Sequence, residues 1–148
     1  MTKNDIVDHL RKDLGEKIQE LEASIRSTRA SRDGNTKSSA GDKHEVGREM
    51  AQQELNALET RLAKTIEMLH LLKSVDPLKR NDEATFGSLV QTNMGIYFIS
   101  VGYGSIRVCD EQVFCISLAS PIGQLFSGKG AKGHLDLNGE KIQILSIE

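Results

Sequence analysis

The sequence of 148 residues is poor in several residue types: it contains no Trp, two Tyr, four Phe, two Pro and two Cys. No apolar run approaches the roughly 18 residues of a membrane span, and the first residues, MTKNDIVDHLRKDLGEK, lack the apolar core of a signal peptide. We therefore expect a cytoplasmic protein without a membrane partner. Cys109 and Cys115 are too few for a disulfide framework or a four-ligand zinc site, so reduced, buried thiols are predicted.

Length and charge narrow the possible classes further. One ordinary domain has about 100–200 residues, so a large multidomain enzyme is excluded. The formal net charge of −2 argues against a protein that wraps nucleic acid, which needs many Lys and Arg side chains facing phosphates. Local basic patches remain possible.

The chain changes character near Pro77. Residues 77–148 hold every Phe and Tyr and nine of the 13 glycines, whereas residues 1–76 are rich in charge. In the first part, apolar residues recur every three or four positions, a spacing typical of helices that meet along one narrow seam. The two series comprise Val7, Leu10, Leu14, Ile18, Leu21 and Ile25, and then Ala51, Leu55, Leu58, Leu62, Ile66, Leu69 and Leu72.

The segment between the two series, SRDGNTKSSAGD, has no apolar stripe and is rich in turn-forming residues. It predicts an antiparallel coiled-coil hairpin over residues 1–76 with its tip around 32–45. Each helix would have about 28–32 residues and extend roughly 45 Å. Because such a hairpin satisfies its own seam, we expect a monomer.

The second part predicts a small β-sheet. Pro77 and LKRNDEAT end the second helix and form a linker over residues 77–85, and GSLVQTN, MGIYFISVG, SIRVCD and QVFCISL are typical of short antiparallel strands. SPIGQLFSGKG favours one short helix, and Asn138-Gly139 indicates the turn of a final hairpin. The predicted fold class is α+β, with a sheet domain over residues 86–148. Its predicted core comprises Val90, Tyr97, Phe98, Ile116, Leu118, Leu125 and Ile144.

Three motifs in the sequence resemble sites without the context that those sites need. Residues 128–133 fit G-x-G-x-x-G, but a dinucleotide fingerprint must open a long helix, and the alternating HLDL follows instead. Residues 123–130 nearly spell a P-loop, but Gly130 stands where Ser or Thr would hold Mg²⁺. The histidines show no metal-ligand spacing. Nucleotide binding and a resident metal centre are therefore not indicated.

Two carboxylates stand at the predicted tip of the hairpin. Asp42 and Glu45 are three residues apart, which is the spacing of a capping box at a helix start. Exposed, paired carboxylates also suit Mg²⁺, a hard cation that shares its oxygen ligands with waters and phosphates. Capping and metal binding are compatible because a carboxylate has lone pairs to spare. Arg29, Arg32, Lys37 and Lys43 lie nearby and could contact phosphates, or form a solvated charged surface.

The order of these features resembles the bacterial Gre-type transcript-cleavage factors (GreA/GreB-like). Gly41, Asp42 and Glu45 match the G-D-x-x-E tip of that family, and residues 120–129, from Ser120-Pro121-Ile122-Gly123 to Gly128-Lys129, match its S-P-I-G-x-x-(L/F)-x-G-K segment. The resemblance covers nearly the whole chain. It implies an FKBP-like C-terminal domain that docks on bacterial RNA polymerase, with Ser120, Pro121, Ile122, Gly123, Gly128 and Lys129 as partner-binding residues.

The resemblance also implies a role in transcription elongation. The hairpin would enter the secondary channel of the polymerase, where Asp42 and Glu45 would help to hold a shared Mg²⁺ during hydrolysis of backtracked RNA. Arg29, Arg32, Lys37 and Lys43 would contact the RNA 3′ end. The protein would not itself be an enzyme and would hold no cofactor in isolation, because the cleavage activity belongs to the polymerase.

Two alternatives stay open. The family usually has Asn-Ala-Glu-Tyr after the second tip acid, whereas this chain has Val46-Gly47-Arg48-Glu49. A regulator that blocks the channel without assisting cleavage is therefore the first alternative. An interaction module for a different partner is the second.

Overall fold

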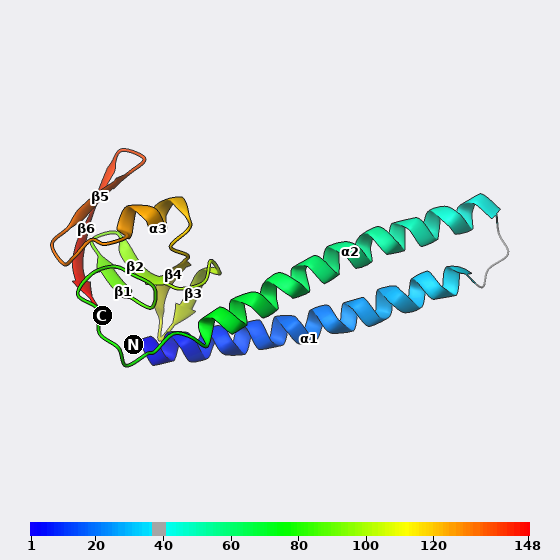
Figure 1. Cartoon of the computed structure of the whole chain (residues 1–148), viewed down its shortest axis with the longest axis horizontal. Helices are drawn as coiled ribbons and strands as arrows, with labels where there is room; N and C mark the ends of the chain where they lie inside the picture. Colours follow the sequence, from blue (N-terminus) through cyan, green and yellow to red (C-terminus); the bar gives the residue numbers. More distant parts are fainter. Residues whose placement is uncertain (37–40) are drawn as a thin grey trace. The chain divides into compact units, whose positions relative to one another are not determined.

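The computed structural model describes the backbone of residues 1–36 and 41–148, and the side chains of residues 1–34 and 45–148. Two long helices open the chain, α1 (Lys3–Thr36) and α2 (Gly41–Leu72). Six strands and a short helix follow, namely β1 (Leu89–Thr92), β2 (Gly95–Ile99), β3 (Gly104–Val108), β4 (Glu111–Ile116), α3 (Pro121–Phe126), β5 (His134–Leu137) and β6 (Glu140–Ile147). The predicted fold class, a long helical hairpin followed by a small sheet with one short helix, is confirmed (Figure 1). No helix of the described residues is both long enough and apolar enough to cross a membrane.

Helices α1 and α2 run antiparallel along the hairpin shaft, which we define as residues 12–69 (Figure 1). The predicted seam is largely confirmed: Leu14, Ile25 and Leu55 are buried. One position is wrong. Ile66 is 47% exposed, whereas its neighbour Thr65 is 6% exposed and occupies the seam. The Thr65 hydroxyl is satisfied there, because it donates to the carbonyl oxygen of Arg61 at 2.7 Å.

The strands form one sheet in the order β3-β4-β2-β1-β6-β5. All neighbours pair antiparallel except β2 and β4, which pair in parallel, from Ile96 opposite Val113 to Ile99 opposite Ile116. The expectation of purely antiparallel strands is therefore wrong at this pair. The intervening strand β3 pairs with the outer edge of β4. Strand β4 therefore lies beside β2 and runs in the same direction as β2. The predicted final hairpin is confirmed, with Asn138 and Gly139 at φ 51° and 82° in its turn.

The core of the sheet gathers around one aromatic cluster. The Tyr97 ring lies 5.3 Å from the Phe114 ring and 5.0 Å from the Phe126 ring, measured between centroids. Tyr97 and Phe98 are both buried although they point to opposite faces of β2, so both faces of this strand are covered. Leu125, expected in the core, is 36% exposed, and Phe126 is fully buried in its place.

The division into three segments expected from the sequence, 1–76, 77–85 and 86–148, stays a prediction, and the structure itself forms two compact units. One unit comprises Met1–Arg11 with His70–Glu148, and the other comprises Lys12–Leu69. The start of α1 belongs with the sheet because it is tied into the linker. Lys3 is buried there, and its Nζ donates to the carbonyl oxygens of Lys79 and, at 3.2 Å, of Gly87.

The two cysteines differ in environment. Cys115, on β4, is buried, and burial raises the pKa of its thiol to about 12. Cys109 was expected to be buried, but it is exposed because it stands in the turn between β3 and β4 at φ 50°.

This difference predicts selective thiol chemistry. We expect the native protein to react with a thiol reagent only at Cys109 near neutral pH, because the thiolate is the nucleophile and Cys115 stays protonated below about pH 12. Thiol counting before and after denaturation measures this. Two equally fast equivalents in the native protein would contradict the burial of Cys115.

Candidate functional site

The tip of the hairpin is only partly described. Glu45, on α2, has an exposed side chain. Lys37 lies outside the described residues, as do the side chains of Asp42 and Lys43. Among the described residues, no group of three or more His, Cys, Asp or Glu side chains could hold a metal ion. The exposed Glu45 carboxylate offers the hard oxygen ligand that Mg²⁺ prefers. It therefore fits a shared ion whose other ligands come from elsewhere.

The two described basic residues near the tip take part in contacts that brace the hairpin. Arg29 Nη2 donates to Glu59 Oε1 at 3.1 Å, and Arg32 Nη1 donates to Gln52 Oε1 at 3.0 Å, each from α1 to α2. Arg32 Nε also donates to Asp33 Oδ1 at 3.2 Å. An exposed ion pair such as Arg29–Glu59 contributes at most about 1 kcal/mol. The predicted contact of Arg29 and Arg32 with RNA stays a prediction.

We call residues 120–129 the docking segment, after the resemblance that marks them. Ser120 caps α3: its Oγ accepts from the Gly123 backbone N–H at 3.0 Å and donates to the Ser117 carbonyl oxygen at 2.7 Å. Pro121 follows at the first helical position, where its lack of an N–H costs nothing. Pro121 is exposed and Ile122 is half-buried against the aromatic core. The motif therefore builds a short helix whose first residue faces solvent.

Gly123 has a further reason to be glycine. It is buried, and a Cβ built on it would lie 1.9 Å from the carbonyl oxygen of Ser117 and 2.9 Å from Cα of Leu118. Real Cβ atoms do not come this close to backbone. The start of α3 thus rests directly on the strand-to-helix connection, and no side chain fits between them.

The end of the docking segment is joined to the linker. The Gly128 N–H donates to the Ala84 carbonyl oxygen at 2.9 Å, and the Ala84 N–H donates to the Lys129 carbonyl oxygen at 2.8 Å. Glu83 and Gly130 form a further antiparallel bridge. Gly128 has φ 76°, which favours glycine. The site residues of the docking segment are therefore brought together with residues 83 and 84. The sequence predicts these two residues only as part of a linker.

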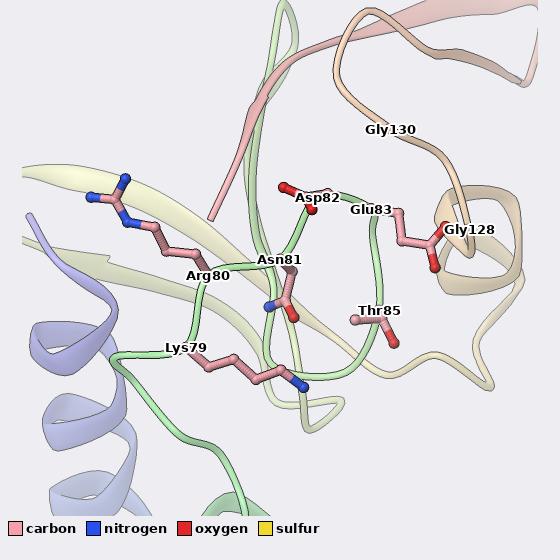
Figure 2. A pocket seen from close by; sticks show the side chains of 8 residues that line it. All are labelled: Lys79, Arg80, Asn81, Asp82, Glu83, Thr85, Gly128 and Gly130. Atoms are coloured by element: carbon pink, nitrogen blue, oxygen red, sulfur yellow. The ribbon is translucent and has the colours of Figure 1, made fainter.

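An open pocket of about 560 Å³ lies between the linker and this turn. Figure 2 shows its lining side chains, with Glu83 and Thr85 on the side of Gly128 and the Arg80 guanidinium pointing away. The basic Lys79 and Arg80 are balanced by the acidic Asp82 and Glu83, so the pocket has no strong preference for one sign of charge. Sequence reasoning missed it. The one available signal was Ala84, the single apolar residue among residues 79–85, which is fully buried in the core.

The chain was also compared with known proteins. No protein-family model matches the sequence, and no curated protein does. The structure of the transcription factor Gfh1 is similar over 93% of this chain and 92% of that chain, at 17% sequence identity and a TM-score of 0.39. A likeness this weak does not assign a function.

Proposed function

We propose that this chain is a cytoplasmic, RNA polymerase-binding transcription elongation factor of the Gre type, which assists the Mg²⁺-dependent cleavage of backtracked RNA. The observation that carries the proposal is the coincidence of two features. The segment that resembles the family's docking motif forms a capped helix on the sheet module, and the segment that resembles the catalytic tip stands where α2 begins.

The docking segment supplies the means of binding. Pro121, Gln124 and Leu125 are exposed on α3, although Leu125 is a large apolar residue. The Ser120 cap and the close contact of Gly123 hold this surface in one conformation before the partner arrives. A preformed surface loses little conformational entropy on binding. The polymerase is thus engaged by a rigid patch of mixed character.

The hairpin tip supplies negative charge at a distance from the docking surface along the chain. Glu45 and Asp42 would hold a shared Mg²⁺ together with the polymerase, and that ion would supply activation of water and stabilisation of negative charge on the RNA phosphodiester. Glu45 and Asp42 contribute carboxylate oxygens and positioning, and no side chain of the factor acts as nucleophile. The protein therefore assists the polymerase's own reaction and is not itself an enzyme.

Cleavage of RNA in stalled, backtracked elongation complexes tests the proposal. Adding the protein should shorten the RNA from its 3′ end in the presence of Mg²⁺. Failure to bind the polymerase would favour an interaction module for another partner.

A specific observation keeps the channel-blocking alternative as the second candidate. Val46 is 54% exposed and Met50 is 65% exposed, and they lie one turn apart on α2 just after Glu45. This apolar surface is better suited to contact with a protein than to contact with charged RNA phosphates. Slower elongation without any shortening of the RNA would favour this alternative.

The hairpin also predicts the oligomeric state. Because Leu14, Ile25 and Leu55 are buried between α1 and α2 of the same chain, the seam that these residues form is already filled within one hairpin. We expect a monomer of 16.3 kDa in sedimentation equilibrium at micromolar concentration. A tight dimer would contradict this prediction.

A further inference from the structure

One side of the hairpin shaft carries a groove of about 540 Å³ between α1 and α2. Its apolar floor is formed by Leu21, Leu58 and Met68, each only half-buried. At Thr65 the buried seam is filled by a small side chain only. The Thr65 hydroxyl already donates a hydrogen bond within α2. The hairpin therefore leaves apolar surface uncovered along this side, whereas Leu14, Ile25 and Leu55 close the seam elsewhere.

The rim of the groove is basic. Lys17 lines it from α1, and Arg61 and Lys64 line it from α2, with Glu20 as the acidic exception. Arg61 and Lys64 are exposed, so their charges can meet a ligand in the groove. An apolar floor with basic edges is complementary to a surface with an apolar stripe and acidic flanks.

We propose that this groove binds an amphipathic α-helix of a partner protein, with its apolar face on Leu21, Leu58 and Met68 and acidic side chains beside Arg61 and Lys64. A third helix laid into the groove between two antiparallel helices completes a three-helix bundle, the helix-in-groove form of recognition. The inference does not depend on the proposed function, because it concerns the shaft and neither the tip nor the docking segment.

The lining favours a helix over RNA. Proteins that bind single-stranded nucleic acid combine basic charge with aromatic side chains on which bases stack. The hairpin sequence, residues 1–76, contains no aromatic residue at all. The floor offers aliphatic and thioether groups instead, and Glu20 repels phosphate.

Binding of two designed helical peptides to the full chain tests the inference. Both have about 20 residues, roughly 30 Å as a helix, which is longer than the stretch lined by residues 17–24 and 58–68, and carry Leu at helical spacing. One has Glu on its flanks and the other has Lys. Fluorescence anisotropy should show that the Glu peptide binds at least about tenfold more tightly than the Lys peptide. The variant with Arg61→Glu and Lys64→Glu should reverse that preference.

A matched control carries the same change of charge elsewhere. Lys12→Glu with Arg26→Glu alters two exposed residues of α1 that do not line the groove, and it should bind like the parent. Circular dichroism should show equal helix content in all variants. Equal binding of both peptides, or an equal effect of both double variants, would overturn the inference. Binding of RNA in the groove would also overturn the inference. In that case an RNA oligonucleotide displaces the Glu peptide from the parent and binds the Arg61→Glu, Lys64→Glu variant poorly.

Discussion

Replacing Asp42 by Asn and Glu45 by Gln together should lower stimulated RNA cleavage by about tenfold or more, which equals ~1.4 kcal/mol of transition-state stabilisation. The reason is that the two substitutions remove formal negative charge, and Mg²⁺ is bound chiefly by anionic oxygens. They retain oxygen acceptors of nearly the same shape. Because α2 begins at Gly41, Asp42 lies in the first turn of the helix and not at the N-cap position that a capping box requires, so the substitutions remove no cap.

The same double variant separates charge from folding. It should melt at the parent's temperature and bind polymerase as the parent does, because Glu45 is exposed and the docking segment is untouched. The measurement is the rate of RNA shortening in backtracked complexes, with the melting temperature and polymerase binding recorded for each protein. Full cleavage by the variant would show that the negative charge of the two tip acids is not needed. Equal blocking of elongation by parent and variant, with no cleavage by either, would favour the channel-blocking alternative.

The hairpin could be predicted because its signal is local and periodic. Leu10, Leu14 and Ile25 recur at helical spacing in a sequence without aromatics, and all three are buried. The error at Ile66 has a physical cause. A hydroxyl that bonds back to its own helix can occupy a seam, so Thr65 competes with the larger Ile66 for the buried position.

The sheet could be predicted strand by strand but not in its pairing. Alternation and turn residues mark each strand, and Asn138-Gly139 marks one hairpin, but nothing in the sequence indicates that β4 lies between β3 and β2 and pairs in parallel with β2. Such long-range pairing depends on the whole core. The same limit explains why Phe126 and not Leu125 is buried: a helix of six residues has too few turns to define a face.

The sequence predicted individual residues of the candidate site but not the surface that they form together. Ser120 and Pro121 could be recognised as a helix start from local chemistry, and the structure confirms that start. The joining of residues 128 and 129 to Ala84 could not, because the two segments are far apart in sequence. The pocket beside them arises from that pairing. Backbone hydrogen bonds between distant segments leave no pattern of side chains to read.

Substituting Gly123 by Ala should destabilise the sheet module by about 3 kcal/mol, the upper part of the usual range for overpacking a full core. The added Cβ would meet backbone atoms, Ser117 O at 1.9 Å and Leu118 Cα at 2.9 Å, and backbone cannot move aside as a flexible side chain can. Relief requires α3 to shift, which breaks the bond from the Gly123 N–H to Ser120 Oγ. We expect the melting temperature to fall by roughly 10 °C, and the affinity for polymerase to fall with it.

The same chemical change at Gly15 provides the control with the opposite sign. Gly15 lies inside α1, and a Cβ there would meet no heavy atom within 4 Å. Gly15→Ala should therefore stabilise the hairpin by up to about 1 kcal/mol, since Ala loses less backbone entropy in a helix. Thermal unfolding of both variants measures the two effects. If Gly123→Ala melts like the parent yet fails to bind polymerase, then Gly123 acts through contact with the partner and not through the packing of α3. If it is destabilised but binds normally at low temperature, the proposed docking surface lies elsewhere on the module, because a displaced α3 cannot present Pro121 and Leu125 as the parent does.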